Sequence, residues 1–385
     1  MSLNVAVSAI VARRKGENDR ENANKVLSLS LAITLVLVVV ISVVCVVFAR
    51  DFLWLSGAKD DTIEPSTAYF KIIMGGLIFN VLTMVINAAQ RGAGNTKIAM
   101  RTNLVSNAVN VLFNYLLIGG NLGFPAMGVQ GAALATVIGT VVSAVMSVLS
   151  VCKPDGFINI RESIKDFKFD KQILKSIANL GSSTLAEQLF LRVGFMIFAL
   201  IVANLGTTAF AAHQIGMNIN SISFSIGDGL SVAAVTLVGQ SLGQKRPDLA
   251  RLYGAACQRI GLFCSAFLAV IYFNFGRQLF SLFSDETEIL DYGVQICRLV
   301  VFIVFLQIAQ VIYSGCLRGA GDTRFVAFAG LISVAIFRPL SAWVMCYPMG
   351  LGLIGVWGGF LVDQCIRLAM TAVRFAKGKW TRIKV

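Results

Sequence analysis

The sequence predicts an all-α polytopic membrane protein made of two pseudo-symmetric helical bundles. Of the 385 residues, 56% are hydrophobic and 14% are charged, and the mean hydropathy is +0.76. An ordinary soluble domain carries about 25% charged residues, so the composition is typical of a membrane protein. The second observation is a repeat, because the Arg-Gly-Ala-Gly sequence at 91–94 returns at 318–321.

The repeat extends well beyond this turn. At the same spacing of 227 residues, Gly128 aligns with Gly355 and Gly131 with Gly358. Polar residues before the turn align as well: Asn80, Thr83 and Asn87 with Gln307, Gln310 and Ser314. With no net insertion between these positions, a duplicated bundle is the simplest account.

Ten apolar stretches are long enough to cross a bilayer, which takes roughly 20 helical residues. They lie at about 26–48, 68–89, 99–118, 129–151, 177–204, 207–238, 252–274, 292–316, 325–346 and 351–373. An eleventh stretch, residues 3–12, is a short stub.

The repeat also predicts the domain layout. Residues 1–152 form an incomplete N-terminal lobe with the stub and four transmembrane helices, and residues 177–385 form a C-terminal lobe of six helices and a basic tail. Residues 153–176 are a cytoplasmic connector, expected along the membrane surface. Residue 1 corresponds to residue 228, so about 50 residues of the second half have no counterpart. We therefore predict an N-terminally truncated chain whose complete form has six helices in each lobe.

The net charge of +13 is explained by topology. Lysine and arginine gather in the loops of one side, at 13–25, 91–101, 153–175, 245–251, 318–324 and 374–385, whereas the other side carries Arg50, Lys59 and Arg277. By the positive-inside rule the basic side is cytoplasmic. This predicts a multi-pass protein of the cytoplasmic membrane with a cytoplasmic C-terminus and no nucleic-acid partner.

Catalytic and metal chemistry find little support. The eight cysteines form no CxxC pair and there is one histidine, so neither a disulfide framework nor a metal centre is indicated. The glycine-rich turns lack the Walker spacing and follow a helix rather than a strand, which argues against nucleotide binding. We expect no enzyme and no cofactor, with energy coming from an H⁺ or Na⁺ gradient.

The two turns are predicted to be structural. Glycine there permits positive φ and close helix approach, and the arginines can meet lipid phosphates at the inner surface. The turn residues in question are Arg91, Gly92, Gly94, Arg318, Gly319 and Gly321.

Polar residues at membrane depth form stripes at helical spacing. One stripe is Asn103, Asn107, Asn110 and Asn114, and another is Gln214, Asn218, Ser221, Ser225 and Asp228. A single polar residue of this kind fits hydrogen-bonded packing between helices, but the set in both halves favours a shared aqueous cavity. The candidate cavity residues are Asn80, Asn87, Asn107, Asn110, Asn114, Gln214, Asn218, Gln307, Gln310 and Arg338.

Ionisable residues within the apolar stretches are few. Glu187 lies about two turns from the cytoplasmic end of its helix, where a carboxylate can carry H⁺ or Na⁺, or can bond to a neighbouring helix or to Arg192. Asp228 is a second ion-coupling candidate, although a capping or pairing role also fits. Asp363 and Arg367 have the spacing of an i,i+4 ion pair. Arg338, before the helix-kinking Pro339, can snorkel or line the cavity.

Several motifs together resemble the multidrug and toxic compound extrusion (MATE) family over essentially the whole chain. They are Ala89-Gln90-Arg91-Gly92-Ala93-Gly94-Asn95-Thr96, Gly123-Phe124-Pro125, Gly128-Val129-Gln130-Gly131-Ala132-Ala133, Ala211-Ala212-His213-Gln214, Thr236-Leu237-Val238-Gly239-Gln240 and Leu317-Arg318-Gly319-Ala320-Gly321-Asp322-Thr323.

The resemblance implies two six-helix lobes around a central cavity and export driven by H⁺ or Na⁺ entry. A family acidic position on the seventh helix matches Glu187. The family's acidic position on the first helix falls in the part this chain lacks, and that on the tenth helix has no match, because Gln307 and Gln310 stand in this stretch.

We therefore predict a monomeric antiporter that exports amphipathic, often cationic compounds. Two alternatives stay open. A flippase for a lipid-linked substrate would need a strongly cationic cavity, for which Arg192 and Arg338 are the candidates. A membrane protein without transport activity would fit the incomplete first half.

Overall fold

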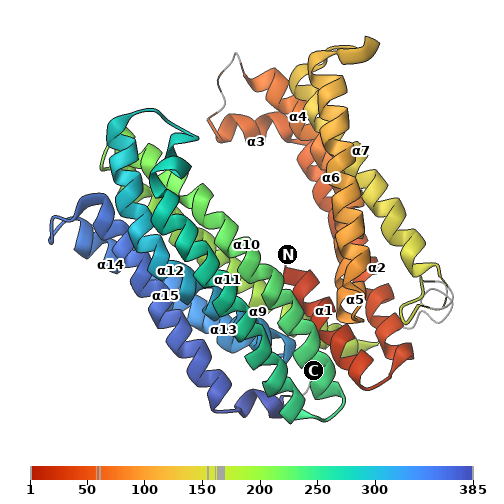
Figure 1. The fold of residues 1–385 in the computed structure, drawn as a ribbon. Coiled ribbons are helices and arrows are strands. Elements are labelled where there is room, and N and C mark those ends of the chain that lie inside the picture. The colour runs from red at the N-terminus through yellow and green to blue at the C-terminus, as the bar shows by residue number, and fades with distance from the viewer. Residues whose placement is uncertain are drawn as a thin grey trace. The chain divides into compact units, whose positions relative to one another are not determined.

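The computed structural model describes residues 2–383, except 58, 60–61, 154–155, 161 and 163–169. Every regular element among the described residues is a helix, and the contacts divide the chain into two compact units (Figure 1). One unit contains residues 18–177, and the other contains residues 4–17 and 178–385. The predicted all-α, polytopic fold is confirmed.

The first unit is organised around its last helix, α7, which packs against α4, α5 and α6, while α2 packs on α4 and α5. Its elements are α2 (Arg20–Val47), α3 (Ala49–Leu55), α4 (Ile63–Gly75), α5 (Leu77–Gly92), α6 (Thr96–Gly119), the 3₁₀ turn η1 (Asn121–Gly123) and α7 (Gly128–Val151). Asp19 caps α2, since its carboxylate accepts a hydrogen bond of 3.1 Å from the Asn22 N–H.

The second unit is organised around α12, which contacts α10, α11, α13 and α15. Its elements are α1 (Ser2–Gly16), α9 (Lys171–Ala203), α10 (Thr207–Gly243), α11 (Pro247–Ser281), α12 (Thr287–Gly319), α13 (Thr323–Gly330), the π-helix η2 (Leu331–Phe337), α14 (Arg338–Cys346), α15 (Gly352–Ala376) and the 3₁₀ turn η3 (Lys379–Arg382).

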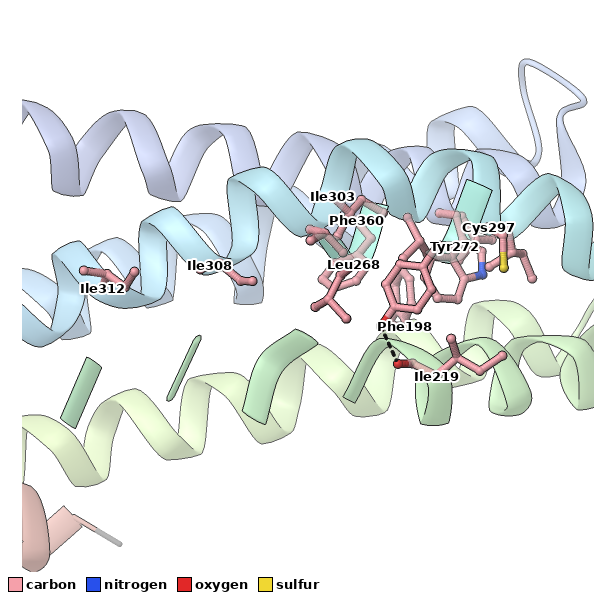
Figure 2. Packing of buried hydrophobic residues seen from close by; sticks show 14 of the residues in the cluster. Phe198, Ile219, Leu268, Tyr272, Cys297, Ile303, Ile308, Ile312 and Phe360 are labelled. Atoms are coloured by element: carbon pink, nitrogen blue, oxygen red, sulfur yellow. Dashed lines mark hydrogen bonds between the residues drawn. The ribbon is translucent and has the colours of Figure 1, made fainter. Parts of the chain in front are cut away.

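A buried apolar cluster fills this second unit (Figure 2). Phe198, Leu268, Ile303 and Phe360 are at most 5% exposed. The Tyr272 hydroxyl is satisfied inside the cluster, because it lies 3.1 Å from the Ile219 carbonyl oxygen and 2.9 Å from the Ser223 hydroxyl.

Small residues let α10 and α12 approach each other closely. A Cβ added at Gly315 would lie 2.5 Å from the Ser231 Oγ, and one added at Gly319 would lie 2.5 Å from the Val235 carbonyl oxygen. Lipid tails are as apolar as leucine, so close packing of this kind is a main source of helix association in a membrane.

By length and apolarity, eight described helices could cross a membrane, or nine if α4 and α5, bent by 41° at Gly76, form one span. All ten predicted stretches are helical. The predicted stretch that lies outside this set is α6, a 24-residue helix that is more polar because of its stripe of asparagines.

The two glycine-rich turns have the same backbone. Gly94 has φ +89° and Gly321 has φ +88°, a region that costs other residues energy. The Asn95 N–H donates to the Gln90 carbonyl at 2.8 Å, and the Asp322 N–H donates to the Leu317 carbonyl at 2.8 Å. The repeat is therefore structural as well as sequential at this point.

Beyond the turns, the uniform spacing of 227 residues does not hold. The Met127 N–H donates to the Leu117 carbonyl, and the Leu351 N–H donates to the Met345 carbonyl in the matching loop. Leu117 and Met345 are 228 residues apart, whereas Met127 and Leu351 are 224 apart.

The first residues of the helices that follow these loops indicate the same register. Gly128 and Gly352 both have φ +53° and both begin a helix, so Gly128 matches Gly352 rather than Gly355. Gly131 matches Gly355 rather than Gly358, since both pack against the end of the preceding helix. The spacing changes because, relative to the first half, η2 adds one residue and the loop that follows α14 is four residues shorter.

The π-helix itself has a local cause. Pro339 has no N–H to donate to the Ala335 carbonyl, and its ring would clash with that carbonyl in a regular α-helix. The chain widens over Leu331–Phe337, just before Arg338-Pro339. Such insertions are frequent at functional sites.

The stub, placed by the sequence in the first lobe, groups with the second unit as α1. Its end crosses the end of α10 reciprocally: a Cβ on Gly16 would collide with the Gln240 carbonyl, and one on Gly243 with the Arg13 carbonyl. The repeat relates Gly16 to Gly243 and Arg13 to Gln240, so the two contacts are equivalent.

Most of the predicted connector lies outside the described residues. Its described beginning packs within the first unit, where the Asn159 N–H donates to the Asn24 side chain at 3.0 Å. At its other end, α9 already begins at Lys171.

Candidate functional site

Glu187 lies at the middle of α9, because the helix starts at Lys171 and not at 177. Its side chain is 4% exposed and accepts a hydrogen bond of 2.5 Å from Arg318. The predicted alternative partner, Arg192, is exposed on the same helix. The structure thus joins Glu187 to the second glycine-rich turn, 131 residues away.

The second turn is held by a further ion pair. Asp322 accepts a bond of 2.7 Å from Arg374 of α15, and the Asp322 side chain is buried while that of Arg374 is half-buried. The arginines of the turns were expected to meet lipid phosphates. At Arg318 the structure instead shows an internal carboxylate, that of Glu187, as the partner.

A second ionic cluster lies in the interior of the same unit. Arg338 is 1% exposed and donates to Asp363 at 2.5 and 3.1 Å, and Asp363 is 3.6 Å from Arg367. Phe195 and Phe360 cover the guanidinium at 4.6 and 4.5 Å from their ring centres. The structure buries Arg338 instead of exposing it to a cavity, since two aromatic rings and a carboxylate enclose it.

The first unit has a neutral counterpart of this cluster. In the corrected register Asn110 matches Arg338, Thr136 matches Phe360 and Gly139 matches Asp363. The Asn110 amide donates to the Thr136 hydroxyl at 3.2 Å, and a Cβ on Gly139 would lie 3.3 Å from the Asn110 Cβ. One helix contact is thus built from neutral groups in the first half and from charged groups in the second.

The predicted stripe on α10 is a surface of the second unit. Gln214, Asn218 and Asp228 are all exposed, as are Ser221 and Ser225 between them. The two serine hydroxyls donate to backbone carbonyls one turn earlier. No ion pair of Asp228 is found among the described residues, so its side chain is available to solvent or ligand.

The other predicted cavity residues fall into two groups. Asn80 and Asn107 are exposed on the first unit. The rest are half-buried or buried among helices: Asn87, Asn110, Asn114, Gln307 and Gln310.

Asn87 shows what this burial means. Its amide donates to Thr102 at 3.0 Å and accepts from Ser147 at 3.2 Å, which ties α5 to α6 and α7. Asn110 similarly ties α6 to α7 through Thr136, whereas Asn114 donates to Asn110 within α6 at 3.1 Å. For Asn87 and Asn110 the structure therefore shows hydrogen-bonded packing between helices, one of the two readings that the sequence allowed.

Sequence reasoning missed the partners more than the residues. Glu187, Arg338, Asp363 and Arg318 were all identified, but neither the Glu187–Arg318 nor the Arg338–Asp363 contact was predicted. The signal that was available is the scarcity of charge at membrane depth, since a buried charge must be paired.

The fold and these contacts define a class, a multi-pass α-helical membrane protein built on a duplicated bundle. The model of the MatE family matches residues 1–116 and 184–344. The chain belongs to this family.

Relatives and a solved structure agree. The chain is 31% identical over 316 residues to the "Probable multidrug resistance protein NorM" of Thermotoga maritima, covering 82% of this chain and 67% of that protein. It is 26% identical over 378 residues to the "Uncharacterized transporter YisQ" of Bacillus subtilis, covering 97% and 82%.

A structure described as the outward-facing conformation of a multidrug resistance MATE family transporter of the MOP superfamily is 22% identical and superposes with a TM-score of 0.90. The match covers 98% of this chain and 84% of that one, and at this identity it shows the fold. Of the two relatives, YisQ is described as a transporter.

Proposed function

We propose that the protein is a multidrug efflux antiporter of the cytoplasmic membrane, in which inward movement of H⁺ or Na⁺ through Glu187 drives export of amphipathic, often cationic compounds. The observation that carries the proposal is the buried carboxylate of Glu187, which forms an ion pair with Arg318. Ionisable groups inside a membrane are costly to leave unpaired, and they mark ion pathways and proton relays.

The exposed polar stripe of α10 supports the substrate side of the proposal. Gln214 and Asn218 lie on it near exposed Ile222 and Phe224. A surface that mixes amide groups with large apolar side chains suits amphipathic compounds. The relative named for multidrug resistance supports the same substrate class.

The flippase alternative finds less support. It needs a cationic cavity, but Arg338 is enclosed and paired, which leaves the exposed Arg192. We further propose that the protein is a monomer. We also propose that its C-terminus is cytoplasmic, because the tail is basic and the positive-inside rule places basic segments on that side.

Accumulation of ethidium in an efflux-deficient bacterial host tests the proposal. Cells that produce the protein are expected to accumulate less dye than cells carrying Glu187→Gln at an equal membrane level. If cells with Glu187→Gln export the dye as well as cells with the unaltered protein do, so that dye accumulation is equally low in both, Glu187 has no coupling role. No reduction by the unaltered chain would contradict its export activity.

A further inference from the structure

Arg318 lies where three segments of the second unit meet. It is in the last turn of α12 and begins the duplicated turn, and its Nη2 bonds to Glu187 of α9. The end of α13 closes the site, because a Cβ on Gly330 would be 3.4 Å from the Glu187 Cγ. The Arg318 side chain is 17% exposed, so it retains a path toward solvent that Glu187 does not have.

The other charged groups around this contact are occupied or exposed. Asp322, in the same turn, is bonded to Arg374 of α15 at 2.7 Å. Arg324 on α13 and Arg192 on α9 are exposed. Among the residues that the structure describes, Arg318 is the charged group that bonds to Glu187.

A buried carboxylate requires one compensating positive charge or a proton, and a second cation beside it is repelled. Arg318 and a coupling cation therefore compete for the same oxygen atoms. We propose that Arg318 is the internal counter-ion of Glu187 and that the coupling cation displaces it. Arg318 is then a positioning residue, and the inference rests on the proposed coupling role of Glu187.

Displacement has a structural consequence. When a proton bonds to a Glu187 carboxylate oxygen, Arg318 keeps its charge and loses its partner, so the guanidinium turns toward solvent. The turn between α12 and α13 is released from α9 but stays attached to α15 through Asp322 and Arg374. The turn thus has one ion pair that exchanges and one that persists.

Reaction with a hydrophobic carbodiimide tests this competition without any transport measurement. The reagent modifies protonated carboxyl groups in apolar surroundings, and peptide mass spectrometry quantifies the product at Glu187 in the purified full-length chain. We expect Arg318→Gln to shift the midpoint pH of labelling upward, since the variant lacks the adjacent positive charge that favours the ionised carboxylate.

The matched control is Arg324→Gln, an exposed arginine in the same turn region, which is expected to leave the midpoint unchanged. Arg318→Lys preserves the charge with a different geometry and should give a smaller upward shift. If Arg318→Gln does not fold, the lysine variant decides the question alone. A midpoint equal to that of the unaltered protein in the folded variants would overturn the inference.

Failure of the proposed function has a different signature. If Glu187→Gln retains gradient-driven export while Arg318→Gln still shifts the labelling midpoint, the coupling role fails and the ion-pair competition stands. If the coupling role holds and the midpoint does not move, the inference about Arg318 fails.

Discussion

The two halves of the chain share a backbone plan but differ in charge at two matching places. After the first glycine-rich turn stands Asn95, and after the second stands Asp322 with its bond to Arg374. Asn110 and Gly139 in the first half match Arg338 and Asp363 in the second. The duplicated helices therefore need no buried charge in order to pack, which directs attention to what the charges of the second half do.

The largest expected effect is loss of the Asp363 carboxylate. Asp363→Ala leaves Arg338 and Arg367 buried together without an acid, which should cost about 3–5 kcal/mol of unfolding free energy. The matching position in the first half, Gly139, has no side chain to remove, so the comparison is Asn110→Ala, which removes the neutral hydrogen bond of the same helix contact and should cost about 1 kcal/mol. Thermal or denaturant unfolding of the purified protein in detergent compares them, and equal losses would contradict an electrostatic difference between the halves.

The register of the repeat gives a smaller effect. Gly131→Ala and Gly355→Ala each place a Cβ 2.5 Å from a backbone carbonyl oxygen, so both should destabilise by about 1–3 kcal/mol. At Gly358 the nearest atom is the flexible Met345 Cε, at 2.6 Å, and alanine should be tolerated there. A Gly358 variant as damaging as the Gly131 variant in the same unfolding measurement would restore the uniform spacing of 227.

The smallest expected effect concerns the residue after each turn. Asp322→Asn gives the second turn the residue of the first and weakens its bond to Arg374, for a loss of about 1 kcal/mol because the pair is partly exposed. Asn95→Asp makes the reverse change at an exposed position and should alter stability by less than about 0.5 kcal/mol. If both changes had the same effect on the melting temperature, Arg374 would have no specific role.

Much of the fold could be predicted from the sequence, because apolar stretches and glycine turns act locally. The positive φ at Gly94 and Gly321 follows from glycine in a short turn, and the ten stretches follow from length. The π-helix was not predictable from periodicity, since it adds a single residue. Pro339 was the local signal for it.

The candidate site was predictable as residue types and not as contacts. Asp363 and Arg367 were paired correctly because they lie on one helix at i,i+4. The shorter bond of Asp363 goes to Arg338, 25 residues earlier, and Glu187 bonds to Arg318 across 131 residues. Such pairs depend on how helices are arranged in space, which spacing along the chain does not specify.

The coupling role of Glu187 is the central claim, and cation movement in proteoliposomes tests it most directly. Outward substrate movement should be accompanied by inward H⁺ or Na⁺ flux, read by a pH-sensitive or Na⁺-sensitive dye trapped inside the vesicles. We expect Glu187→Gln to abolish this flux, whereas Asp228→Asn, at an exposed acid of α10, retains most of it. Flux that persists in the Glu187 variant and disappears in the Asp228 variant would contradict the account.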